Sequence, residues 1–291
     1  MNSTFQLDDM VIHQIVERQA SSTHALDYLP GLTPEILAEN RSWLAPHALD
    51  TEDKLVMCFQ SYIVQTPYHT VLVDSCIGND KDRPNRQDWH MKTDDTYMQG
   101  LAAIGIALDE IDFVLCTHLH ADHVGWNTRL LDGRWVPTFP NARYIFAARE
   151  YAYWLEQHGK AAVPPMVDSV LPVVAAGRAD LVSASHVLND HIRLMATPGH
   201  TPDHFAIRLG RGKDHAVMAG DLIHSPLQAR YPELSMWADF DAEQAKRTRR
   251  QFLETYCDTE TLCCTAHFPS PSSGHVIRWD DGFRFRSRSR S

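Results

Sequence analysis

The sequence lacks the features that mark secreted, membrane-spanning and thiol-based proteins. Its first residues carry acidic side chains where a signal peptide needs basic ones, and no continuous apolar stretch follows. No segment reaches the ~18 apolar residues of a membrane span. The 6 cysteines include no CxxC pair, which disfavours a zinc ribbon or a redox site. We therefore expect a soluble, cytoplasmic protein with no membrane partner.

The chain also lacks an excess of basic charge. Its 27 Lys and Arg face 37 Asp and Glu, a formal net charge of −10 at pH 7, and the acidic residues are spread along the sequence. Such a surface disfavours broad contact with a phosphate backbone, so we expect no nucleic-acid partner. A GxSxG nucleophile elbow is missing as well, which disfavours a serine hydrolase.

What the chain does contain is an alternation of strand-like and helical segments, with 44% apolar residues over 291 positions. The strand-like runs cover residues 58–66, 70–75, 111–118, 142–147, 192–197, 204–209 and 216–221, and a hairpin is predicted at 275–286. Helical spacing covers residues 96–108, 148–158 and 241–256. Interleaved strands and helices predict a mixed α/β (α+β) fold in which helices cover sheets.

The first fifty residues differ from the rest of the chain. They are polar and punctuated by prolines, and we expect irregular structure with a single helix at 34–44. We therefore predict an N-terminal extension over residues 1–50 and one main domain over residues 51–291. The extension and the proline-rich loop at 163–174 also suggest surfaces that cover a site or form a homodimer.

Four residues of metal-binding type crowd into six positions directly after a buried strand. They are His118, His120, Asp122 and His123, and they follow the apolar run 111–116. Imidazole and carboxylate without thiolate suit a hydrolytic site for zinc, manganese, cobalt or iron rather than a closed structural site. A merely solvated polar turn gives no reason for this crowding, so the pattern predicts metal binding.

Further candidate ligands follow other apolar strands. His200 lies in TPGHTP, Asp221 in AGD and His267 in AHF. Each residue alone is more often structural than a ligand. Together with the first cluster, they become candidates for the remaining metal ligands.

The motifs resemble those of a known family. THLHADHVGW (residues 117–126) resembles the HxHxDH signature of the metallo-β-lactamase superfamily, and TPGHTPDH, AGDLIH and TAHF resemble its later motifs in the same order. The resemblance extends from about Leu55 to Arg286. It implies an αββα sandwich with two metals at one edge between the sheets, so that residues 51–291 form a metallo-β-lactamase-like hydrolase domain.

The resemblance also implies how the ligands divide between two divalent ions, for which Zn²⁺ is expected and Mn, Co or Fe are alternatives. The first ion takes His118, His120 and His200, the second takes Asp122, His123 and His267, and Asp221 bridges the two. Asp74 supports the ligand histidines from behind. Ser75 and Cys76 depart from the Thr-Gly pair that is commoner in the family.

Two such ions would lower the pKa of a shared water far below that of bulk water, towards ~7, so no protein nucleophile is needed. Asp122 is expected to double as a proton shuttle to the leaving group. His224 stands where acyl-homoserine lactonases carry a tyrosine, and it resembles the branch that includes methyl parathion hydrolase and lactonase-like enzymes. Either His224 polarises a carbonyl or phosphoryl oxygen of the substrate, or it packs behind the ligands.

These observations predict a metal-dependent hydrolase that opens a lactone or cleaves a related ester in a small-molecule substrate. Phosphotriesterase, glyoxalase II-like thioesterase and β-lactamase activities are alternatives within the same chemistry. An iron-dependent persulfide dioxygenase is the alternative of another class. Trp126 and Phe268 each follow a ligand, so each is expected either to border the cleft or to pack in the core.

Overall fold

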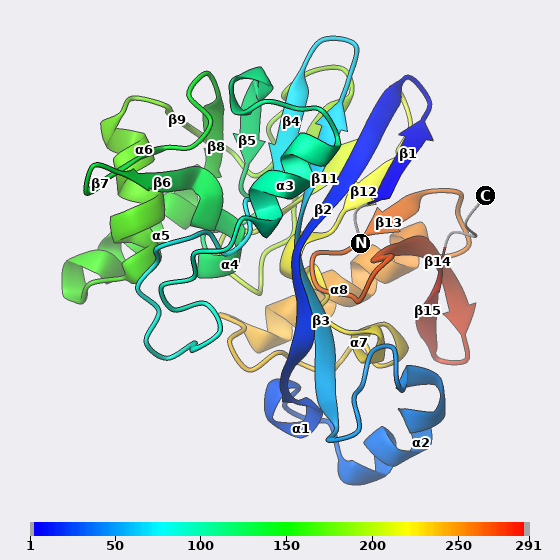
Figure 1. Ribbon diagram of the computed structural model, residues 1–291. Coiled ribbons are helices and arrows are strands. Elements are labelled where there is room, and N and C mark those ends of the chain that lie inside the picture. Colours follow the sequence, from blue (N-terminus) through cyan, green and yellow to red (C-terminus); the bar gives the residue numbers. More distant parts are fainter. Residues whose placement is uncertain (1–2, 288–291) are drawn as a thin grey trace. The chain divides into compact units, whose positions relative to one another are not determined.

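The computed structural model describes residues 3–287, and Figure 1 labels their helices and strands. These residues cluster into two compact units. Unit 1 comprises residues 3–17 and 59–184, and unit 2 comprises residues 18–58 and 185–287. Strands β2 (Met10–His24) and β3 (Lys54–Gln65) each run through the boundary between the units.

Unit 1 is built on a seven-stranded sheet with the strand order β1-β2-β3-β4-β5-β8-β9. The neighbours β4, β5, β8 and β9 run parallel, whereas β1 and β3 pair antiparallel with β2 and β4, respectively. Strands β6 and β7, which fall between β5 and β8 in the sequence, form a separate antiparallel pair. The remaining bounds are β1 (Ser3–Leu7), β4 (Thr70–Val73), β5 (Phe113–Leu115), β6 (Thr128–Leu131), β7 (Arg134–Pro137), β8 (Arg143–Ala147) and β9 (Ala179–Val182).

The helices of unit 1 bury apolar stripes against this sheet. Tyr97 and Leu101 of α3 (Thr96–Ala103) pack in one core with Leu72 and Val114 of the sheet. Trp154 of α5 (Ala148–Lys160) is partly buried and packs against the same core. The short helices α4 (Ala121–Val124) and α6 (Leu171–Ala175) complete the unit.

Unit 2 is built on a six-stranded sheet with the order β10-β11-β12-β13-β14-β15. Among the described strands of this sheet, β12 and β13 are the one parallel pair. The chain between them contains α8, whose Phe252, Leu253 and Tyr256 pack on Val217 and Val276 of the sheet. The bounds are α1 (Ala25–Tyr28), α2 (Pro34–Leu44), β10 (Ile192–Ala196), β11 (Phe205–Leu209), β12 (Ala216–Met218), α7 (Pro226–Arg230), α8 (Ala242–Tyr256), β13 (Leu262–Cys264), β14 (Ser273–Trp279) and β15 (Gly282–Ser287).

The predicted mixed α/β class is confirmed, with helices against both main sheets. The predicted strands, the helices at 34–44, 96–108, 148–158 and 241–256, and the C-terminal hairpin are all present, with ends shifted by a few residues. No helix in the described part of the chain is long and apolar enough to cross a membrane.

The expectation of irregular structure before the first helix was wrong, because residues 3–24 form β1 and β2. Strand β2 was not recognised because it carries many polar side chains, and several of these are buried with hydrogen-bond partners. Gln14 donates to Gln60 Oε1, and His13 Nε2 lies 3.0 Å from Gln65 Oε1. The boundary between an extension and a main domain near residue 50 remains a prediction.

Candidate metal centre

The HxHxDH motif of unit 1 is fixed by a close approach of two turns. A Cβ atom on Gly125 would lie 1.9 Å from the carbonyl oxygen of Ile77, so no other residue fits there without a backbone shift. The contact aligns the turn after β4 with the motif, because Ser75 N–H donates to His123 O and Gly125 N–H donates to Cys76 O. Cys76 holds a left-handed φ of 50°, a conformation that glycine adopts more easily.

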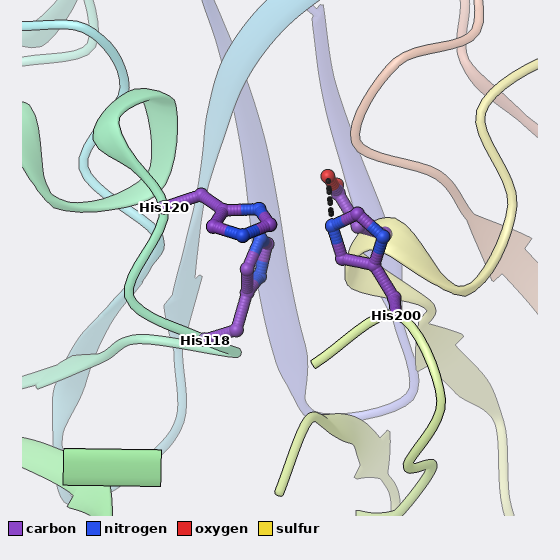
Figure 2. A group of neighbouring side chains, drawn as sticks. His118, His120 and His200 are labelled. Carbon is purple, nitrogen blue, oxygen red and sulfur yellow. Dashed lines mark ion pairs between the residues drawn. The ribbon is translucent and has the colours of Figure 1, made fainter. Parts of the chain in front are cut away.

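Three imidazole rings of the motif gather within this unit. The His118 ring centre lies 4.6 Å from that of His120 and 4.1 Å from that of His123. Figure 2 shows the His118 and His120 rings turned towards one another. Asp122 keeps 14% of its side chain exposed, with Oδ2 3.9 Å from His123 Nε2. His118 and His123 are buried, so this set offers imidazole nitrogens together with one carboxylate in contact with solvent.

Asp74, at the end of β4, orients two of these rings. Its Oδ2 lies 2.9 Å from His123 Nδ1, and Thr117 Oγ1 donates to the same oxygen over 2.9 Å. Thr117 Oγ1 in turn lies 3.1 Å from His118 Nδ1. Both Nδ1 atoms therefore have an acceptor, which leaves Nε2 of each ring as the atom that can bind a metal. Asp74 thus lies behind the rings of His118 and His123, and its support of them as metal ligands stays a prediction.

The second set lies in unit 2 and is centred on Asp221, which follows β12. Asp221 Oδ1 lies 3.0 Å from His267 Nε2, and its Oδ2 lies 3.1 Å from His224 Nε2 and 3.4 Å from His200 Nε2. The dashed line in Figure 2 marks the ion pair of His200. The atoms of Asp221, His224 and His267 are close enough together to share one ion. Three strand ends thus supply one buried cluster.

The outer nitrogens of this set are held in the same manner. His200 Nδ1 lies 3.0 Å from Asp239 Oδ1, and His267 Nδ1 donates to Cys58 O over 2.8 Å. His224 differs, because its buried Nδ1 has no hydrogen-bond partner among the described residues and its Nε2 lies against Asp221. The geometry therefore separates His224 from the ring arrangement shared by His200 and His267.

A buried arginine on α8 braces this half of the site. Arg249 Nε donates to Leu222 O, next to Asp221, and its Nη1 donates to Pro232 O and Leu234 O over 2.9 and 2.7 Å. Its Nη2 lies 3.8 Å from Asp239 Oδ2. Arg249 thus links the Asp221 turn to the carboxylate that orients His200.

The sequence reasoning did not identify Asp239 or Arg249 as part of the site. One signal was available for Arg249, because it shares the helical stripe of Ala245, Phe252 and Tyr256, where an apolar residue is expected. Asp239 carries no such signal, since it lies in a loop.

Two further residues hold the His200 and Asp221 turns. Gly199 has φ of 135°, and a Cβ atom on it would lie 2.3 Å from the backbone nitrogen of Ala245, so the start of α8 packs directly on the TPGH turn. The buried His204 accepts from Asp221 N–H through its Nε2 over 3.0 Å. The glycine and the second histidine of TPGHTPDH therefore have positioning roles.

Burial and neighbouring carboxylates shift the pKa values of two imidazoles of unit 2 in opposite directions. Burial alone would lower the pKa of His200, but hydrogen bonds to Asp221 and Asp239 outweigh it and raise the pKa to about 9. Burial lowers the pKa of His224 to about 4, against a smaller opposing effect of Asp221. His224 is therefore neutral near pH 7, whereas His200 holds a proton at that pH when no metal is bound, and an ion bound at this ring would take the place of that proton.

The donor chemistry of both sets fits divalent ions of borderline softness. Nε2 of His267 faces Asp221 while its Nδ1–H is already given to a carbonyl, so either a proton or a cation must lie between that nitrogen and the carboxylate. Imidazole and carboxylate donors without thiolate suit zinc and its neighbours. The seven predicted ligands fall into the two sets, with His118, His120, Asp122 and His123 in unit 1 and His200, Asp221 and His267 in unit 2.

The two aromatic residues that follow ligands lie in cores. Trp126 is 4% exposed, stacks on Tyr97 at 5.3 Å and donates its Nε1–H to Glu17. Phe268 is 5% exposed and packs in the core of unit 2. The core alternative therefore holds for both. Trp154 of α5 contacts the His120 ring edge-to-face, with ring centres 5.5 Å apart.

Comparison with known proteins identifies a family. A family model described as the metallo-beta-lactamase superfamily matches residues 60–267. An N-acyl homoserine lactonase of Bacillus cereus is 21% identical over 179 residues, which are 61% of this chain and 64% of that relative. An uncharacterized protein of Caenorhabditis elegans is 26% identical over 159 residues, which are 54% of this chain and 33% of that relative. The chain thus matches less than two thirds of the length of either relative.

Solved structures share the fold over the whole chain. A hydrolase of the beta-lactamase superfamily, AbOPH, has a TM-score of 0.84 at 21% identity, with 100% of this chain and 98% of that chain covered. The dizinc quorum-quenching lactonase AidC, in complex with a product, has a TM-score of 0.81 at 19% identity and the same coverage. At these identities the likeness concerns the fold.

Proposed function

The chain belongs to the metallo-beta-lactamase superfamily, and from that premise we propose that it is a binuclear metal-dependent hydrolase that opens lactones or cleaves related esters. In this proposal the two histidine sets supply one centre. His118, His120 and His200 hold one ion, Asp122, His123 and His267 hold the other, and Asp221 bridges them. Zn²⁺ is the expected metal.

The observation that carries the proposal is the orientation of four imidazoles. His118, His123, His200 and His267 each direct Nδ1 at a protein oxygen, which leaves Nε2 as the ligand atom. Metal-binding histidines are oriented in this way, because the outer partner fixes the tautomer and raises the basicity of the ligand nitrogen. A purely structural histidine cluster has no need for this common arrangement.

Two divalent ions would supply an activated water and a Lewis acid for the bond that is cleaved. The chain's own residues do the rest. Asp122, whose carboxylate is partly exposed, can pass a proton between the site and the leaving group. His224 is buried and neutral, and with its Nε2–H given to Asp221 it can accept a hydrogen bond at Nδ1 without adding charge.

Support for a lactone or ester substrate comes from the relatives. The Bacillus cereus relative is named an N-acyl homoserine lactonase, and AidC is described as a lactonase with a bound product. His224 in place of the tyrosine of acyl-homoserine lactonases extends the proposal to other esters, with phosphotriesters as a side activity.

Initial rates on a panel of substrates test the proposal. The panel contains an acyl-homoserine lactone, an aromatic lactone, a phosphotriester, a thioester and a cephalosporin, each with zinc-loaded and chelator-treated enzyme. We expect the fastest turnover with one of the two lactones, loss of that turnover on chelation and recovery on addition of Zn²⁺.

Two results would contradict the proposal. If the zinc-loaded enzyme turns over only the thioester or only the cephalosporin, the protein is a thioesterase or a β-lactamase instead. Enzyme purified with iron that consumes oxygen with a persulfide and hydrolyses no panel member would make it an oxygenase.

A further inference from the structure

Unit 2 contains a cavity of about 320 Å³ that the proposed hydrolase site does not use. Its walls come from the end of α2, the start of α7, the segment after His267 and the hairpin β14-β15. The lining residues used below are Trp43, His47, Phe268, Trp279, Arg284 and Phe285. A volume of this size lies within the range of small-ligand sites in proteins.

The walls are aromatic and held in place. Trp43 and Trp279 meet edge-to-face with ring centres 5.0 Å apart, and Phe268 and Phe285 do so at 4.9 Å. The segment between Phe268 and Ser272 closes on itself, since Ser272 Oγ donates to Phe268 O over 2.6 Å. The cavity therefore offers preformed π surfaces, which favour a flat aromatic ligand over a flexible one.

The polar groups at the cavity are cationic or neutral. Arg284 lines it, with its guanidinium 5.7 Å from the Trp279 ring, and the guanidinium of Arg230, which does not line the cavity, lies 5.2 Å from the ring of the same tryptophan. Among the described residues that line the cavity, none is Asp or Glu, although the chain carries 37 acidic residues in all. This local charge complements an anionic head group.

The cavity is separate from the ligand set of the same unit, although the two share one segment. His267 turns its Nε2 to Asp221, whereas the next residue, Phe268, lines the cavity. Neither Asp221 nor any other predicted metal ligand lines it. Occupation of the cavity therefore needs no metal.

We propose that this cavity is a second binding site, which takes a small planar aromatic carboxylate. The ring lies among Trp43, Trp279, Phe268 and Phe285, and the carboxylate faces Arg284. The site is independent of the hydrolase reaction. If no ligand binds in this cavity, the proposed function is unaffected.

Calorimetric titration of the full chain with 1-naphthoate tests this site, with 1-naphthylmethylammonium as the ligand of similar shape and opposite charge. We expect the anion to bind at least about tenfold more tightly than the cation, and tryptophan fluorescence to change with the anion. Binding should persist after chelation and in His118→Ala. Decanoate, an alkyl carboxylate, should bind more weakly than naphthoate.

Variants locate the ligand. Trp279→Ala should weaken naphthoate binding about tenfold, and Arg284→Gln about threefold to tenfold. Trp237→Ala and Arg278→Gln, which change exposed residues of the same unit outside the cavity, should leave the Kd within about twofold. Arg284 is exposed, so Arg284→Gln keeps the test valid if Trp279→Ala destabilises the hairpin.

Several outcomes would overturn the inference. Equal affinity for the anion and the cation would remove the role of Arg284, and tighter binding of decanoate would remove the preference for a ring. Loss of binding on chelation would place naphthoate at the metal centre. No binding, together with a dimer that Trp279→Ala converts to a monomer in light scattering, would make this face a contact between two copies of the chain.

Discussion

The two ligand sets are built in different ways. In unit 1, four predicted ligands occupy six consecutive positions, and one turn packed on Gly125 fixes them. In unit 2, the ligands are spread over residues 200–267 and meet because three strand ends, the start of α8 and Arg249 bring them together. The first set depends on local backbone geometry, whereas the second depends on the packing of the unit.

This difference has an energetic consequence. A local set tolerates distant changes, because its geometry is contained within a few hydrogen bonds of one turn. A dispersed set can be disturbed from any of the elements that carry it. Five substitutions, tested in four experiments, sharpen or break this contrast, and they are given from the largest expected effect to the smallest.

Asp221→Ala should have the largest effect, because this one carboxylate contacts His200, His224 and His267. We expect kcat/KM to fall roughly a thousandfold or more and bound metal to decrease. Glu254→Ala, which removes an exposed carboxylate of α8 in the same unit, is the control and should change neither quantity. Full metal content and activity in Asp221→Ala would refute its assignment as the bridging ligand.

Arg249→Met should lower the free energy of unfolding by about 3 kcal/mol, because it leaves buried carbonyls and Asp239 without their cation. Arg250→Met, one position on, removes only exposed ion pairs and should cost at most about 0.5 kcal/mol. Denaturant unfolding measures both. Equal free energies of unfolding of the two variants would show that the stability of unit 2 does not depend on the contacts of Arg249.

Asp239→Asn and Asp74→Asn compare the outer partners of the two sets. Each removes a charged acceptor from an imidazole Nδ1, and each should weaken metal binding about 10–100-fold. Competition with a chromophoric chelator measures the affinity. Asp82→Asn, which removes an exposed carboxylate from Nδ1 of His90, an imidazole outside the predicted ligands, is the matched control and should leave metal affinity unchanged. If only one of the two variants weakens metal binding, the outer partners of the two sets do not contribute equally to metal affinity.

His224→Phe should have the smallest effect among these changes. Because the His224 Nδ1 is not held as in the other rings, we expect metal content to remain and kcat to fall about tenfold. Steady-state kinetics with a lactone, alongside metal analysis, separates the two quantities. Unchanged kcat would reduce His224 to a packing role, and loss of metal would make it a ligand.

Much of the fold could be predicted because its apolar runs are regular. The buried strand at Phe113–Leu115 and the helix at Ala242–Tyr256 show their periods clearly in the sequence. The strand at Met10–His24 could not be recognised, because buried partners such as Gln60 for Gln14 satisfy its polar residues. Those partners lie far along the chain, and a single sequence does not indicate which distant polar groups will meet.

The same limit applies to the candidate site. The motif around His118 and His120 was recognisable because its residues are adjacent. The partners Asp239 and Arg249 were not, because a loop aspartate and a helix arginine have many ordinary uses. Their roles follow only from the hydrogen bonds to His200 and to the Asp221 turn.

The most direct test of the binuclear proposal is the number of metal ions per chain. Protein loaded with Zn²⁺ and freed of loosely bound metal is analysed for its elements, as wild type and as the double variant His120→Ala/His267→Ala. The proposal predicts about two ions per chain in the wild type and a clear loss in the double variant. Wild-type protein without bound metal, or a double variant that retains two ions, would contradict it.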